Sequence, residues 1–327
     1  MRKLPLNALT AAMAIVASAT LSVMPAAGQT FPEAGKPINL IVPFSPGGSV
    51  DVSARLIAPL LEKELGTTVQ VVNRAGAGSQ VGLNAMLRSK PDGYTMAFTI
   101  LPLTITTYLN PQLKAAFSRK DFQPLAMHTS DAQYLTVLSS SRFKSAKEII
   151  EAAKASPNKI TTSATGRFSP EHLAILQLQE LTGTKFAIVF FDGGAAQTAA
   201  LLGGHVDFQL STLGNFTSAY KNNQVRFLGV AAREDEPRLD NIPTLESQGY
   251  KIYSYVSRGI SVPAHTPEPV LTKLTQAIEK VMQSPEHKKS VDEMFMTLRY
   301  MNPKDMASFW DGVEAQTKPL LLSAAAE

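Results

Sequence analysis

Two short segments combine the residue types and spacing that could bind a ligand. In the first, the apolar run 39–42 leads into Pro-Phe-Ser-Pro-Gly-Gly-Ser at 43–49, and apolar residues then recur with helical spacing over 50–65. The pattern predicts a strand, a Gly-Gly loop and a helix that ends at Gly66. Free backbone N–H groups at the positive end of a helix dipole suit an anion. An ordinary strand-to-helix turn without a ligand is the alternative.

A second segment repeats this design. A strand expected at 160–163 leads into Ala-Thr-Gly-Arg-Phe-Ser-Pro-Glu at 164–171. Ser169 is a suitable N-cap and Pro170 a suitable first helical residue. A small polar loop therefore precedes a second helix N-terminus.

Three other kinds of site find little support in the sequence. Gly76, Gly78 and Gly82 follow a strand, but their spacing is one residue longer than the dinucleotide fingerprint, and no acidic strand end follows about 20 residues on. Residues 78–82 read G-S-x-x-G, whereas a hydrolase nucleophile elbow reads G-x-S-x-G. The five histidines are scattered, so each is expected at the surface or in a loop. We therefore predict no catalytic residue, no metal and no cofactor.

The elements around the two loops alternate between strands and helices. Strands expected at 67–72 and 95–100, with a helix ending near 89 between them, complete a βαβαβ pattern, which predicts parallel strands. Further strands are expected at 134–138, 186–191, 206–210 and 225–231, and a capping box at 145–148 opens a helix. An extended segment at 252–262 and helices at 268–283 and 305–318 follow. Pro59 should kink or interrupt the first helix, at ~3 kcal/mol.

Composition limits the compartment and the number of domains. Arg2 and Lys3 precede a charge-free apolar stretch and small residues at 26–28, so 1–28 is expected to be a cleaved secretory signal. A membrane anchor is the alternative, but the apolar stretch is short. The absence of cysteine argues against a lipid anchor and disulfides, and favours a freely diffusing periplasmic protein. The remaining chain carries 29 basic and 27 acidic residues, which gives no sign of nucleic-acid binding, and its length suits two domains.

Four motifs resemble those of the periplasmic solute receptors of tripartite tricarboxylate transporters, the Bug family. They are the run 36–55, Asn-Arg-Ala-Gly-Ala-Gly at 73–78, Pro-Asp-Gly-Tyr-Thr at 91–95 and Val-Pro-Ala-His-Thr-Pro-Glu-Pro-Val at 262–270. The resemblance implies an α/β fold of the type II periplasmic binding protein class, with two doubly wound lobes and a ligand cleft between them. Lobe 1 would comprise 31–128 and 256–327, and lobe 2 would comprise 129–255.

The resemblance also implies reversible binding of a small organic carboxylate by both loops, through backbone N–H groups, hydroxyls and water. The residues carried over are Phe44, Ser45, Gly47, Gly48 and Ser49, followed by Asp51, in the first loop. In the second they are Thr165, Gly166 and Ser169, together with the start of the helix that follows. The implied protein partners are the membrane permease subunits of a tripartite transporter. The chain itself is expected to be a monomer.

The second loop departs from the family pattern of Gly-x-Gly-Ser/Thr. Phe168 stands at the second glycine position, so its side chain either turns to solvent or forms a wall of the pocket. Arg167 beside it either binds a second carboxylate or lies at the surface. Arg258, on the returning segment, is a further cationic candidate.

These departures favour an aromatic or dicarboxylic ligand. Phe44 and Phe168 would contact an apolar body, and Arg167 or Arg258 a distal acid group. A small-molecule enzyme on a doubly wound fold and a carboxylate sensor used only for signalling are the alternatives.

Overall fold

The computed structural model describes residues 31–233, 239 and 241–324. The expected secretory signal at 1–28 lies outside these residues. No helix in the described part of the chain combines the length and the hydropathy needed to cross a membrane.

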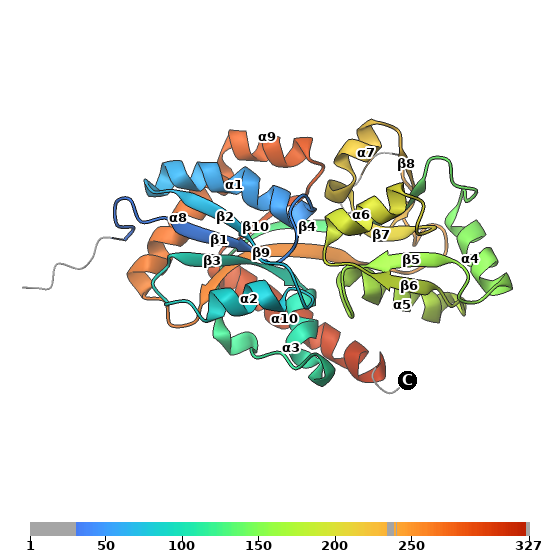
Figure 1. Ribbon diagram of the computed structural model, residues 1–327, viewed down its shortest axis with the longest axis horizontal. Helices are drawn as coiled ribbons and strands as arrows, with labels where there is room; N and C mark the ends of the chain where they lie inside the picture. Colours follow the sequence, from blue (N-terminus) through green and yellow to red (C-terminus); the bar gives the residue numbers. More distant parts are fainter. Residues whose placement is uncertain (1–30, 234–238, 240, 325–327) are drawn as a thin grey trace, which may run out of the picture. The chain divides into compact units, whose positions relative to one another are not determined.

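A parallel three-stranded unit holds the first loop (Figure 1). β1 (Ile38–Val42) lies between β2 (Val69–Asn73) and β3 (Thr95–Leu101) and runs parallel to both. α1 (Ser49–Leu65) and α2 (Gln80–Leu87) connect these strands, so the predicted βαβαβ unit is confirmed. α1 continues through Pro59 without interruption. Pro59 lies on the exposed face, where the carbonyl that it leaves unpaired can bond to water.

Three antiparallel strands extend this sheet, and two of them, β4 (Phe122–Leu138) and β9 (Tyr255–Pro263), connect it to the rest of the chain. β9 pairs with β3 and with β4, and β10 (Leu298–Met301) pairs with the other edge of β4. The strand order is β10-β4-β9-β3-β1-β2. β4 pairs with β9 up to Ala132, and from Gln133 onward it pairs with β7 (Gln209–Thr212) and β8 (Val225–Val230). Strand pairing therefore changes a few residues beyond the lobe boundary that we predict between 128 and 129.

The second half of the chain contains a separate small sheet. β5 (Thr161–Ala164) and β6 (Ala187–Phe190) pair in parallel and do not join the large sheet. The same part of the chain forms four helices: α4 (Ala146–Ala155), α5 (Pro170–Thr182), α6 (Gly194–Leu202) and α7 (Thr217–Lys221). Ser145 caps α4 by accepting the Glu148 N–H, whereas the Glu148 carboxylate accepts from Lys144 rather than from Ser145. The predicted capping box is therefore only half formed.

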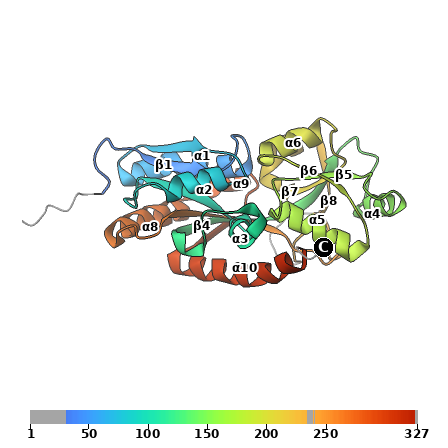
Figure 2. The same ribbon diagram turned by 60° about the horizontal axis from the view of Figure 1, so that its bottom comes forward.

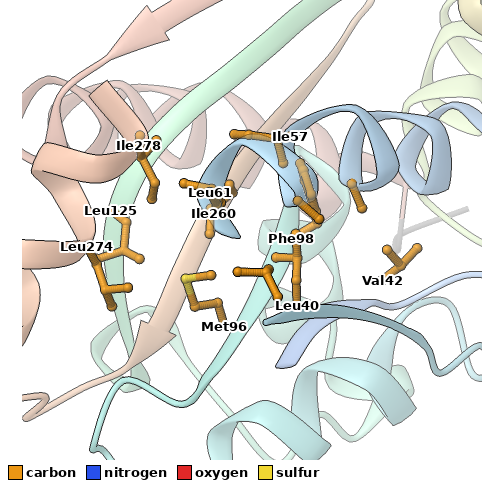
Figure 3. Packing of buried hydrophobic residues seen from close by; sticks show 14 of the residues in the cluster. Leu40, Val42, Ile57, Leu61, Met96, Phe98, Leu125, Ile260, Leu274 and Ile278 are labelled. Carbon is orange, nitrogen blue, oxygen red and sulfur yellow. The ribbon is translucent and has the colours of Figure 1, made fainter. Parts of the chain in front are cut away.

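Helices cover both faces of the large sheet. α1 and α8 (Glu268–Gln283) pack on one face, with α9 (Pro285–Glu293) beside them. α3 (Leu103–Leu109) and α10 (Pro303–Ala324) pack on the other face, where Figure 2 shows α10 beside α3 and β4. Figure 3 shows the first core, with Leu40, Val42, Ile57, Leu61, Met96, Phe98, Leu125, Ile260, Leu274 and Ile278 labelled. This core fixes β1 and α1, and with them the loop that joins the two.

Candidate functional site

The first loop (43–49) is held by a buried carboxylate at the start of α1. Asp51 is 3 % exposed and accepts hydrogen bonds from the Gly47 N–H, Arg55 Nε and Asn73 Nδ2, each at 2.9 Å. Asn73 Nδ2 also donates to the Phe44 carbonyl at 3.1 Å. Burial alone raises the pKa of Asp51, but these hydrogen bonds, led by the one from Arg55, outweigh it and lower the pKa below its usual value. Asp51 therefore positions the loop and is already satisfied within the protein.

The start of α1 lies directly against segments from the second half of the chain. The Ser49 N–H donates to Asn215 Oδ1 at 2.8 Å, and Asn215 Nδ2 donates to Ser211 Oγ at 2.8 Å. A Cβ placed on Gly48 would lie 3.3 Å from the backbone nitrogen of Ala195. Gly48 therefore permits a close approach between the first loop and the start of α6.

Arg258 is the centre of a buried polar cluster on β9. Its side chain is completely buried, and its Nη1 donates to the Asp131 carboxylate and to Thr129 Oγ1. Its Nη2 donates to Ser49 Oγ at 2.8 Å and to Thr212 Oγ1 at 3.2 Å. The cluster thus joins α1, β4, β7 and β9 through one guanidinium group. Asp131 already neutralises the charge of this group.

The second loop (164–169) is fixed at the N-terminus of α5. As predicted, Ser169 is the N-cap and accepts from the His172 N–H. The Phe168 backbone has a φ of 58°, its N–H donates to His172 Nδ1 at 2.8 Å, and its carbonyl accepts from Thr106 Oγ1 at 3.0 Å. The Phe168 side chain is buried against the His172 ring, so it does not turn to solvent. Arg167 is exposed, with its guanidinium 5.8 Å from the centre of the Phe190 ring.

A cavity of about 30 Å³ lies where the two loops meet. Of the predicted residues, it is lined by Phe44, Ser45, Gly48, Ser49, Thr165 and Arg258. The predicted residues outside its lining are Gly47, Gly166, Arg167, Phe168 and Ser169. A water molecule needs roughly 10–15 Å³, so the cavity has room for about two. In this conformation an organic ligand would not fit wholly within the cavity.

Pro170 and Glu171, which also line the cavity, form the helix start that the resemblance implies. Sequence reasoning missed the rest of the lining, namely Val50, Ile100, Leu103, Gly194, Thr212, Asn215 and Val256. Ile100, Leu103 and Val256 give the cavity an apolar wall, and their pattern in the sequence is that of ordinary core residues. Gly194 could have been predicted from its sequence pattern. It follows a predicted strand in the run Asp-Gly-Gly at 192–194, which repeats the strand, Gly-Gly and helix pattern of the first loop.

Two larger cavities lie away from both loops. One of about 160 Å³ is bounded by residues that include Asp131, Asp292 and Phe295, and one of about 270 Å³ by residues that include Arg88 and His265. Neither is lined by a residue of the first or second loop. The small cavity is therefore the candidate site because both predicted loops contribute to its lining, and not because of its size.

The prediction that the histidines are at the surface or in loops is wrong for three of them. His128 on β4 and His287 on α9 are buried, with their Nε2 atoms 2.9 Å apart. Burial lowers the pKa of His287 to about 4 and that of His128 well below its usual value, so both rings are neutral near pH 7. His172 is buried in α5, and burial together with Arg167 lowers its pKa to about 4. Among the described residues, no group of three or more side chains could hold a metal ion.

Comparisons with known proteins agree with this fold. Residues 53–324 match the family model described as tripartite tricarboxylate transporter family receptor. The chain is 30 % identical over 301 residues to the UPF0065 protein in the gbd 5′ region of Cupriavidus necator, covering 90 % of each chain. It is 28 % identical over 276 residues to protein BugT of Bordetella pertussis, covering 83 % of this chain and 82 % of the relative.

Solved structures show the same architecture. The periplasmic binding protein BugD superposes with a TM-score of 0.83 at 25 % identity, covering 91 % of this chain and 99 % of BugD. MatC from Rhodopseudomonas palustris with bound malate has a TM-score of 0.82 at 24 % identity, covering 89 % and 100 % of the two chains. A second R. palustris protein, with adipate, has a TM-score of 0.82 at 21 % identity, covering 90 % and 98 %.

The predicted α/β periplasmic binding protein fold is thus confirmed, and so is the resemblance to the Bug family. The chain belongs to the tripartite tricarboxylate transporter receptor family, whose members are solute receptors and not enzymes.

Proposed function

We propose that this chain is a periplasmic receptor that binds a small organic carboxylate between the first and second loops and delivers it to the membrane subunits of a tripartite transporter. The observation that carries the proposal is the convergence of both loops, with the N-termini of α1 and α5, on one cavity. Malate in MatC and adipate in its R. palustris relative support a carboxylate as the ligand class.

The polar groups around the cavity suit a carboxylate. Ser45 and Ser49 supply hydroxyls, and two helix N-termini supply partial positive charge. Several such donors offset the desolvation of a carboxylate without a dedicated counter-ion. Arg258 also lines the cavity, and its Nε has no hydrogen-bond partner among the described residues. We propose that Arg258 acts as a hydrogen-bond donor to the ligand.

The predicted residues that do not line the cavity would reach the ligand in a more open conformation. Because the cavity has room for only about two water molecules, we propose that the protein opens further to admit a ligand. β4 and β9 connect the two proposed lobes, so a hinge in these strands would separate the loops. In an opened state Gly47, Gly166, Arg167, Phe168 and Ser169 would then border the ligand. In this proposal the secretory signal is removed and the receptor acts as a monomer.

Thermal unfolding with a ligand panel tests this function. The chain without residues 1–28 is unfolded in the presence of mono-, di- and tricarboxylates, both aliphatic and aromatic. A ligand at 100 times its Kd adds ~2.7 kcal/mol of stability, which raises the melting temperature by several degrees. We expect such a shift with one chemical class. No shift, together with no bound molecule in mass analysis of the denatured protein, would contradict the proposal.

A further inference from the structure

An acidic side chain lines the candidate cavity without a basic partner. Glu171, in the first turn of α5, is 5 % exposed and borders the cavity. Its Oε2 accepts a hydrogen bond from Thr165 Oγ1 at 2.8 Å. No Lys, Arg or His in the described part of the chain forms an ion pair with it. The other charges at the cavity are paired, since Asp51 binds Arg55 and Arg258 binds Asp131.

This arrangement conflicts with a ligand that offers only carboxylates. Glu171 is only 5 % exposed, so a second anion bound beside it places like charges close together where water screens them only in part. The N-terminus of α5 offsets part of the Glu171 charge, but the dipole is also needed for the ligand carboxylate. A ligand that carries a positive group would instead provide the partner that a buried carboxylate requires.

We propose that the receptor selects a carboxylate that also carries an ammonium group, and that this ammonium binds the Glu171 carboxylate. The ligand carboxylate then binds at the Ser49 and Arg258 side of the cavity. Thr165 holds one Glu171 oxygen and leaves the other for the ligand. This inference rests on the proposed function and narrows its ligand class.

Matched ligands separate the effect of the ammonium group from that of size. Succinate, malate and aspartate share one carbon skeleton and carry hydrogen, hydroxyl and ammonium at the same carbon. Glutarate with glutamate, and 3-phenylpropionate with phenylalanine, extend the comparison to longer and aromatic bodies. One of these sets should have the carbon skeleton that fits the cavity. Within that set, calorimetric titration near pH 7 should give a Kd at least about tenfold lower for the ligand with the ammonium group than for its counterparts without it.

Substitution of Glu171 identifies the group responsible. In Glu171→Gln the preference for the ammonium member should fall about tenfold, while the affinity for its ammonium-free counterpart stays or rises. Glu180→Gln removes an exposed carboxylate from the same helix and should leave the preference unchanged. Retained binding of the ammonium-free ligand shows that the Glu171→Gln variant is folded.

Three results would overturn the inference while leaving the proposed function intact. They are a tightest ligand that lacks an ammonium group, a preference for malate over aspartate, and an unchanged preference in Glu171→Gln. Absence of binding by every carboxylate, in these sets and in the wider panel, would overturn both proposals.

Discussion

Removing the Asp131 carboxylate should destabilise the protein strongly, because it leaves Arg258 buried without its counter-ion. Both side chains are nearly inaccessible, at 5 % and 1 % exposure. After Asp131→Asn, the guanidinium keeps only neutral acceptors as partners, namely the hydroxyls of Thr129, Ser49 and Thr212 and the new amide oxygen. Hydroxyls satisfy hydrogen bonds but do not neutralise a charge, so the desolvation of Arg258 is no longer offset.

The expected loss is about 3–5 kcal/mol in the free energy of unfolding, the range found when one partner of a buried ion pair is removed. The double change Asp131→Leu with Arg258→Met removes both charges and replaces them with apolar groups. Because such replacements are often neutral, the double variant should be more stable than Asp131→Asn. A double variant more stable than Asp131→Asn would show that the single variant is destabilised by the unpaired charge of Arg258 and not by a loss of packing.

Urea unfolding followed by circular dichroism and by fluorescence of Trp310, the single tryptophan, measures these free energies. Coincidence of the two transitions supports a two-state treatment. Glu151→Gln is the control, since it breaks the exposed Lys147–Glu151 pair and should cost only about 0.2–1 kcal/mol. An Asp131→Asn loss no greater than that of the control would refute the reasoning.

Three further predictions follow from particular residues. The pKa values of His128 and His287 in the folded protein lie below the usual ~6.5. Between pH 6.5 and 4 the unfolded state therefore binds more protons than the folded state. The free energy of unfolding should fall as the pH falls through this window. In urea unfolding, His287→Gln should reduce this slope by up to ~1.4 kcal/mol per pH unit, and an identical slope would contradict the assignment. Phe168→Gly should change the order of affinities across the carboxylate panel, and unchanged affinities for every ligand would exclude a role for Phe168 in specificity. Gly48→Val should weaken ligand binding at least about tenfold in calorimetry, because its side chain meets backbone in the closed form, whereas Gly312→Val, which points into open space, should not.

Features set by local chemistry were predictable from the sequence. The start of α5 follows from Ser169 and Pro170, and α8 has the predicted bounds because its apolar residues keep a regular helical spacing. The first loop follows from the Gly-Gly turn between a buried strand and an amphipathic helix. In each case the residues that determine the element lie within the element itself.

Features set by distant partners were not predictable. The first part of β4 contains buried polar residues, among them Thr129 and Asp131, whose partner Arg258 lies on β9. These residues interrupt the apolar pattern, so only the end of this strand was recognised. Asn215 has no special pattern in the sequence and lines the cavity only because folding brings the segment after β7 to the first loop.

A crystal structure of the chain without its signal, bound to the tightest carboxylate of the panel, tests the central claim most directly. We predict that the ligand carboxylate lies between the two loops, within hydrogen-bonding distance of Ser49 and Arg258. A ligand seated instead in the cavity beside Asp292 and Phe295, or on the outer surface, would contradict the assignment of the site.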